Sequence, residues 1–185
     1  MKKIIADPNA FTDQRDPKYN NYEVAAKTVF EMAMIGRTIY FDNKNSYAEG
    51  VIAYNCEMDV VEGSDYVSGT RPNPPKEWKA EVARLESANV IDEDGTFTKD
   101  YHFSSFSQAV RIISNKADMS GWISWYDGGK SEEGRRNMGE YRLEAYHTII
   151  DIINSGAITT RKKGVNRMDI AIKMAVKELK KTWIV

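Results

Sequence analysis

The sequence predicts an α+β fold, in which a small antiparallel sheet packs with helices and a C-terminal helical hairpin follows. Short strand-like segments bounded by turn residues occupy the middle of the chain, and apolar residues recur at helical spacing on both sides of them. The glycine-rich stretch DGGKSEEG marks a boundary beyond which the chain is wholly helical. We therefore expect an α+β domain over residues 1–127 and a helical hairpin with a basic face over residues 128–185.

The first part of the chain alternates between turn-rich loops and short regular elements. KKII, residues 2–5, is expected to form an edge strand. Apolar residues recur at helical spacing from Tyr22 onward and stop at Gly36, which predicts a helix over residues 22–35. Cys56 is expected inside the strand region that follows. Three short segments bounded by turn residues predict its strands: RTIYF, VIAYN and MDVVEG.

Residues 76–114 predict a helix, a strand and a second helix. Apolar spacing indicates a helix over residues 76–88, and TFTKDYHF is expected to be a strand. Ser105 and Gln108 have the spacing of a capping box, in which the serine oxygen accepts a hydrogen bond at the helix start and the glutamine reaches back to the N–H of the cap. The serines of DYHFSSFSQAV are therefore predicted to start a helix over residues 106–114 rather than to act as nucleophiles.

The segment WISWY is expected to be a short strand after Gly121. Side chains alternate along a strand, so Trp122 and Trp125 would point to opposite faces and one of them is a candidate exposed contact. Two helices are predicted beyond the boundary, the first ending near Gly156 and the last with a lysine stripe opposite its apolar side. Their hairpin either docks on the sheet domain or mediates homodimerisation, because both arrangements need the same apolar stripe.

Several segments of the middle of the chain follow one another in a characteristic order. They are VVEGS, then Arg71, then FTKDYHFSSFSQAV and GWISW. Over residues 47–127 this order resembles a small family of domains of unknown function, close to the RAMA module, that are fused behind GIY-YIG nucleases or found among restriction-modification proteins. Phe106 replaces a usual proline of that family, and Ser120 replaces a usual asparagine.

The resemblance implies a link to restriction or defence systems. TIYFDNKNSY, residues 38–47, faintly echoes the strand pair of a GIY-YIG nuclease. However, no glycine precedes Ile39 and Tyr40, and no Tyr-Ile-Gly sequence follows them. We therefore do not extend the nuclease activity to this chain.

Composition bounds the class of protein. No apolar run approaches the roughly 20 residues of a membrane helix, so no membrane contact is expected. A single cysteine, Cys56, excludes an internal disulfide and a multi-cysteine zinc site, and we expect a cytoplasmic protein, in the host cell if a phage encodes it. Residues 156–185 hold eight basic and two acidic residues, a net charge of +6. Because the whole chain has a net charge of −1, the first 155 residues have a net charge of −7.

Sites for catalysis and for metal are weakly indicated. Glu144 and His147 have Glu-x-x-His spacing, with Glu140 one turn earlier on the same face. Carboxylate-bridged metal bundles use two such motifs, and a single copy favours a solvated helix face instead. Cys56 has no local base, and GGKS lacks the earlier glycine of a phosphate-binding loop. We predict no metal and no cofactor.

Basic and aromatic residues remain as the best binding candidates. Lysine and arginine beside phosphates release counterions, and tryptophan stacks on unpaired bases. The candidates for nucleic-acid or partner binding are Trp122, Trp125, Arg135, Arg136, Arg142, Arg161, Lys162, Lys163, Arg167, Lys173, Lys177 and Lys180.

Three functions are weighed first, beside a small-molecule or purely structural role. The first is a non-catalytic counter-defence inhibitor of anti-CRISPR or anti-restriction type, which binds a nucleoprotein effector, such as a Cas9-type protein or a restriction enzyme, or the RNA or DNA of that effector. The second is a nucleic-acid-binding accessory module of a restriction or defence system. The third is a partner-dependent nuclease that would use Glu140, Glu144 and His147.

Overall fold

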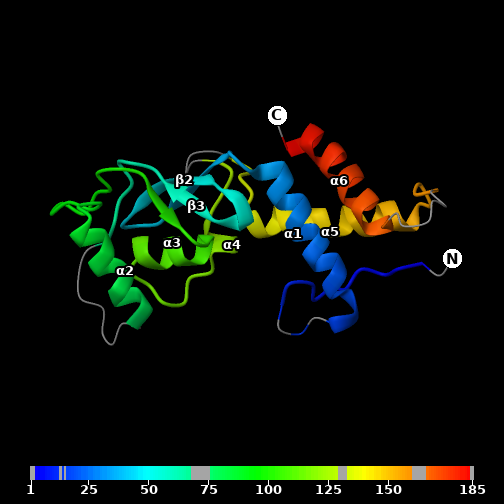
Figure 1. Cartoon of the computed structure of the whole chain (residues 1–185), viewed down its shortest axis with the longest axis horizontal. Helices are drawn as coiled ribbons and strands as arrows, with labels where there is room; N and C mark the ends of the chain where they lie inside the picture. Colours follow the sequence, from blue (N-terminus) through cyan, green and yellow to red (C-terminus); the bar gives the residue numbers. More distant parts are fainter. Residues whose placement is uncertain are drawn as a thin grey trace. The chain divides into compact units, whose positions relative to one another are not determined.

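The computed structural model describes residues 3–12, 14, 16–67, 76–128, 133–159 and 166–183. This part of the chain holds a four-stranded antiparallel sheet and six α-helices, so the α+β prediction is confirmed (Figure 1). The chain divides into two compact units, one of Met1–Met34 with Glu140–Val185 and one of Ile35–Gly139. The helix predicted over residues 22–35 therefore groups with the C-terminal helices, whereas the sequence places it beside the sheet.

The sheet of the Ile35–Gly139 unit has the strand order β1-β2-β3-β4, with every neighbouring pair antiparallel. Its strands are short and follow one another along the chain, which keeps the connections local. Buried and more exposed side chains alternate along the strands, so that one face of the sheet is buried and the other is open. The strands are β1 (Thr38–Asp42), β2 (Tyr47–Ile52), β3 (Met58–Val60) and β4 (Tyr101–Phe103).

Strand boundaries differ from the predictions in three places. β2 begins at Tyr47 and ends at Ile52, so VIAYN covers only its end. Cys56 is buried, but it lies in a 3₁₀ turn, η2 (Tyr54–Cys56), and not in a strand. Only the last three residues of TFTKDYHF form β4, because Phe97 takes part in isolated bridge pairing with Ile91 instead.

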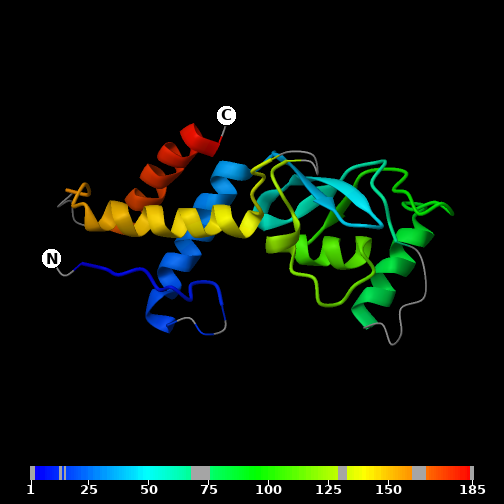
Figure 2. The same cartoon turned by 180° about the vertical axis from the view of Figure 1, so that it is seen from behind.

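Three helices complete the sheet unit: α2 (Lys76–Ser87), α3 (Phe106–Ile113) and α4 (Gly121–Ser124). α3 lies against the buried face of the sheet, where it contacts β3 and β4 (Figures 1 and 2). The prediction of a strand over WISWY is wrong, because its first residues turn into the short helix α4. Only Tyr126 pairs in a β manner, through hydrogen bonds in both directions with Tyr40 at the edge of β1.

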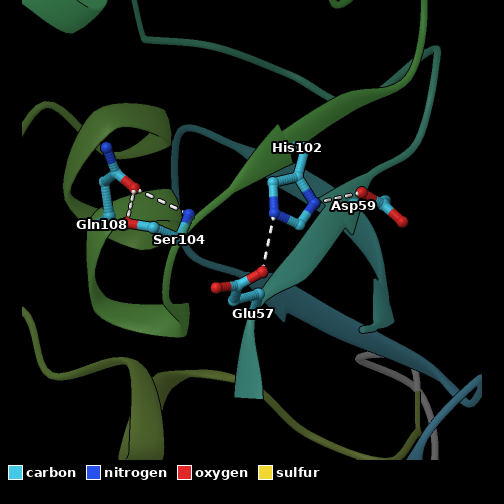
Figure 3. Close-up of polar contacts among 5 residues, drawn as sticks. All are labelled: Glu57, Asp59, His102, Ser104 and Gln108. Carbon is cyan, nitrogen blue, oxygen red and sulfur yellow. Dashed lines mark hydrogen bonds and ion pairs between the residues drawn. The ribbon is translucent and has the colours of Figure 1, made fainter. Parts of the chain in front are cut away.

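The capping box predicted at the start of α3 is confirmed for its serine arm. Ser105 Oγ accepts a hydrogen bond of 3.1 Å from the backbone N–H of Gln108. The glutamine arm reaches one residue further back than predicted, where Gln108 Oε1 accepts from the backbone N–H of Ser104 at 2.9 Å and from its hydroxyl at 2.7 Å (Figure 3). The helix start is thus fixed by both serines.

Trp125 is the central side chain of the sheet unit. It is completely buried, and its ring centroid lies 5.8 Å from that of Phe41. The indole N–H donates a hydrogen bond of 3.1 Å to the carbonyl oxygen of Phe106 at the start of α3. Gly50 provides the room for this ring, because a Cβ there would lie 3.4 Å from Trp125 and 2.1 Å from Met58 Cε.

The second unit contains α1 (Asn20–Met34), most of α5 (Met138–Asn154) and α6 (Arg167–Trp183). α6 packs along α1. KKII does not form a strand within its described residues. Instead Ile4 exchanges two hydrogen bonds with the side chain of Asn154, its N–H donating at 2.8 Å and its carbonyl oxygen accepting at 2.7 Å. The first described residues are therefore held by a side chain at the end of α5.

Gly121 is predicted to be intolerant of any side chain. A Cβ at this position would lie 2.2 Å from the carbonyl carbon of Phe106 and 2.4 Å from the amide nitrogen of Ser107. These are backbone atoms, and moving them to make room costs free energy. We expect Gly121→Ala to lower the free energy of unfolding by about 1–3 kcal/mol, measured by urea denaturation. Ser120→Ala is the matched control, because the Ser120 side chain makes no capping hydrogen bond. Equal stability of Gly121→Ala and the parent chain would contradict the close approach.

Candidate nucleic-acid interface

α6 has one buried side and one open, positively charged side. The buried side consists of Ala171, Ala175, Val176, Leu179 and Trp183. Lys173, Lys177 and Lys180 are exposed, as predicted, and they recur at intervals of four and three residues. This spacing places them along one side of the helix over about 10 Å of its length. We call Lys173, Lys177 and Lys180 the lysine stripe.

Trp183 anchors the end of α6. Its ring meets that of Tyr141 edge to face with centroids 4.9 Å apart, and its indole N–H donates to Glu144 Oε2 at 3.0 Å. Asn166 precedes the other end of the helix and accepts a hydrogen bond of 2.9 Å from the N–H of Met168. Both ends are thus fixed by polar contacts, so that the lysine stripe is carried on a defined helix.

The charge of α6 is not neutralised within the helix. Arg167 and four lysines stand against Asp169 and Glu178, which gives 5 − 2 = +3. Within the described part of the chain, the lysine stripe makes no ion pair. Lys180 lies in the last turn, where a cation also stabilises the helix dipole. Lys173 and Lys177 lie further from that end, so the dipole does not account for them.

The arginines predicted as contacts have structural partners. Arg135 forms an ion pair with Asp42, which raises the pKa of its guanidinium, and it lies 4.1 Å from the ring centroid of Tyr126. Arg142 lies 4.1 Å from the ring centroid of Phe11. Arg136 is held through its backbone N–H, which donates to Asp127 Oδ1 at 2.7 Å. None of these contacts joins an arginine to the lysine stripe.

The other residues predicted as contacts differ in their exposure. Trp125 is completely buried and therefore has no face to offer a base. Trp122 is partly buried, with its ring edge-to-face on Phe106 at a centroid distance of 5.2 Å. Arg167 begins α6 and is exposed. Arg161, Lys162 and Lys163 lie outside the described residues.

The nuclease candidates do not converge on a common point in the described structure. Glu144 accepts the hydrogen bond from Trp183, and the ring of His147 packs edge to face on Tyr146 with centroids 5.6 Å apart. Glu140 is exposed in the first turn of α5. Among the described residues, no group of three or more histidines, cysteines or acids is placed to hold a metal ion.

A polar cluster on the open face of the sheet was not predicted from the sequence. His102 of β4 lies directly opposite Asp59 of β3 in the strand register. Its Nδ1 is 2.7 Å from Asp59 Oδ1, and its Nε2 is 3.0 Å from Glu57 Oε2 (Figure 3). The one available signal was the outward position of Asp59 and His102 in their strands, and pairing them requires the register between segments 43 residues apart.

Both ring nitrogens of His102 face a carboxylate, which favours the protonated imidazole. Hydrogen bonding to Asp59, together with Glu57, raises the pKa of His102 above its ordinary value, against the opposing effect of burial. The doubly protonated ring donates to both partners. His102 is therefore positioned between two acids, and its side chain remains about half exposed, at 53%.

The pKa of His102 is predicted to depend mainly on Asp59. We expect Asp59→Asn to lower the pKa of His102 toward 6.5, and by more than Glu57→Gln does, in an NMR titration of the imidazole. Because the folded pKa is raised, the stabilisation is fully present below the ordinary pKa and is lost as the pH rises through the folded value. The control is Glu49→Gln, which alters an acid of β2 that is hydrogen-bonded to Tyr47. An unchanged titration in Asp59→Asn would refute the assignment.

Comparison with known proteins gives one match. The sequence model of the family described as Domain of unknown function (DUF4357) matches residues 39–136, more than half of the chain. This range contains residues 47–127, so the resemblance is confirmed as far as a domain of unknown function in the middle of the chain. Neither the curated proteins nor the solved structures gave a match. Within the described residues, none of the helices combines the length and apolarity needed to cross a membrane.

Proposed function

This chain belongs to the DUF4357 family, and we propose that it is a non-catalytic counter-defence inhibitor that binds a nucleoprotein effector or its nucleic acid. The observation that carries the binding role is the lysine stripe of α6, exposed and without an ion pair in the described structure. The choice of target is supported by the resemblance to domains found among restriction-modification proteins. Such an inhibitor works in the cytoplasm, on a Cas9-type effector or a restriction enzyme.

The lysine stripe suits contact with a phosphate backbone. Phosphates of one strand follow each other every 3.4 Å or so along a duplex axis, so a stripe of about 10 Å faces about three of them. Each lysine that neutralises a phosphate releases condensed counterions, which makes the affinity fall with salt. Because the opposite side of α6 is buried, the helix can present these charges without losing its own packing.

The remaining charge of the chain supports contact with a protein partner as well. The first 155 residues carry −7, and acids lie on the open face of the sheet. Glu49 is on that face, where it accepts a hydrogen bond of 2.9 Å from the hydroxyl of Tyr47, and the rings of Tyr40 and Tyr47 are stacked with centroids 6.4 Å apart. Acidic groups of this kind offer a basic nucleic-acid cleft the charge it normally binds, which is the basis for inhibition.

A nucleic-acid-binding accessory module of a defence system is the second candidate. The lysine stripe favours this role equally, because it needs only a phosphate backbone as its target. The two functions differ in the need for an effector. An accessory module binds nucleic acid alone, whereas the inhibitor binds or inactivates the complete effector.

Charge reversal of the stripe is predicted to weaken salt-dependent binding of nucleic acid. We expect the triple variant Lys173→Glu, Lys177→Glu, Lys180→Glu to lose most of the affinity for labelled RNA or duplex DNA, with the salt slope reduced by about 0.7–0.9 for each lysine. An electrophoretic shift assay at several salt concentrations measures both. The control variant changes charge equally at Lys44, Lys79 and Lys116, which are exposed in the sheet unit. Equal weakening by both triple variants would exclude a specific role of the stripe.

The same assay with a Cas9-type effector and its guide RNA tests the inhibitor role. We expect the chain to shift the loaded effector, and to reduce its cleavage of target DNA, more strongly than it shifts free nucleic acid. The triple stripe variant is expected to lose both effects. The chain could instead bind free nucleic acid and leave cleavage by every tested effector unimpaired. That result would exclude the inhibitor role and favour the accessory module.

A further inference from the structure

The open face of the sheet carries an exposed tyrosine that is bonded to two carboxylates. Tyr47 begins β2, and 37% of its surface is exposed. Its hydroxyl donates a hydrogen bond of 2.9 Å to Glu49 Oε1, and its backbone N–H donates one of 2.8 Å to Asp65 Oδ2. In each of these carboxylates the other oxygen has no partner in the described structure. Both acids therefore retain the capacity to accept hydrogen bonds from a further group.

A second tyrosine lies across the strand pair from Glu49. In the register of β1 and β2, Tyr40 is opposite Glu49, and Asp42 is opposite Tyr47. The rings of Tyr40 and Tyr47 are stacked, with centroids 6.4 Å apart. Aromatic rings and carboxylates thus alternate over this part of the open face, both along and across the strands. We call Tyr40, Tyr47 and Glu49 the tyrosine patch.

The chain itself shows what this combination of groups binds. Arg135 forms an ion pair with Asp42, of which only 5% of the side chain is exposed. The Cζ atom of the same arginine lies 4.1 Å from the ring centroid of Tyr126, which pairs with β1. One guanidinium is thus held by a tyrosine ring and a carboxylate together. Tyr47 and Glu49 repeat this combination, and in the described part of the chain no cation pairs with Glu49.

The charge around the tyrosine patch is acidic. Asp42 and Arg135 cancel each other in their ion pair. Glu49 and Asp65 then stand against Lys44 of the turn between β1 and β2, which gives −2 + 1 = −1. The face of an aromatic ring also carries partial negative charge, so it attracts a cation. Both the carboxylates and the rings therefore favour a positively charged occupant and disfavour an anion such as phosphate.

We propose that the tyrosine patch binds an arginine side chain of a protein partner. A guanidinium is flat and always charged, so it can lie on the ring of Tyr47 while the N–H groups at its edge reach the carboxylate of Glu49. An ammonium is a compact and strongly hydrated charge without a flat face, which makes lysine the poorer occupant. The inference rests on the protein contact in the proposed function, because clefts that hold nucleic acid use arginine for this purpose.

Two short peptides test the tyrosine patch without involving nucleic acid. One is a blocked Gly-Arg-Gly peptide, and in the other citrulline replaces the arginine, which keeps the flat shape and removes the charge. We expect the arginine peptide at millimolar concentration to move the backbone N–H signals of Tyr47 and Glu49 saturably in NMR spectra of the full ¹⁵N-labelled chain. The citrulline peptide is expected to bind several-fold more weakly, and a lysine peptide to lie between the two.

Matched variants separate the tyrosine patch from general attraction to an acidic chain. Tyr47→Leu removes the ring and is expected to weaken binding of the arginine peptide about two- to fivefold, the effect of an exposed cation–π contact. Glu49→Gln removes the charge and is expected to weaken binding by a similar factor. The controls are Tyr54→Leu and Glu77→Gln, which change an exposed tyrosine and an exposed acid elsewhere in the sheet unit. We expect both controls to leave the affinity unchanged.

Three outcomes would overturn the arginine assignment. The first is that the signals of Tyr47 and Glu49 do not move, or move equally with the arginine and the citrulline peptide. The second is equal weakening by Tyr47→Leu and Tyr54→Leu, which indicates nonspecific contact. The third is stronger movement of the two signals with a single-stranded oligonucleotide than with the arginine peptide, which would make the tyrosine patch a base-stacking surface.

A failure of the tyrosine patch and a failure of the lysine stripe give different results. The triple stripe variant is expected to bind the arginine peptide at least as well as the parent chain, because the peptide contains no phosphate. Tyr47→Leu is expected to leave the binding of free nucleic acid unchanged. Loss of peptide binding alone would therefore remove the arginine site, and loss of nucleic-acid binding alone would remove the role of the stripe.

Discussion

The sheet unit depends on the burial of one indole, that of Trp125. The ring packs on Phe41 of β1 in the space that Gly50 leaves in β2, and its N–H is bound to the first residue of α3. The backbone on either side continues this role, because Trp125 accepts from the N–H of Met138 and Tyr126 pairs with β1. Trp125 thus joins the sheet and α3 through its side chain, and the start of α5 through its backbone carbonyl. The pattern Gly-Trp-x-x-Trp is explained by Gly121, which admits the close turn, and by Trp125, which fills the core.

In the second unit, the apolar residues of α6 lie on one side of the helix and the lysine stripe lies on another. Alanines and Leu179 bury one side, and Trp183 is fixed by Tyr141 and Glu144. The lysine stripe takes no part in these contacts, and substitutions at exposed positions change stability by less than about 0.5 kcal/mol. The residues of the stripe can therefore change without loss of the fold.

Elements with a strong local signal could be predicted from the sequence, and elements decided by distant contacts could not. Helical periodicity and the Ser105 cap identify α1, α2, α3, α5 and α6 because both depend on residues within a few turns. WISWY is too short to distinguish a strand from a helical turn, and the contact of Gly121 with the backbone of Phe106 decides the question. To find the His102 cluster, one must know the register of β3 and β4. To find the cavity lined by residues of α2 and α3, one must know how these two helices pack together. Neither leaves a trace in local spacing.

The lysine stripe would respond to the phosphate backbone of a nucleic-acid target and not to its base sequence. Exposed lysines interact with phosphates whatever the base sequence, and their contribution weakens as salt is added. Phosphate contacts position a protein on nucleic acid, whereas base contacts select a site. A phosphate-binding role for the lysine stripe would therefore position the chain on nucleic acid, and the selection of a particular site would need contacts beyond the stripe.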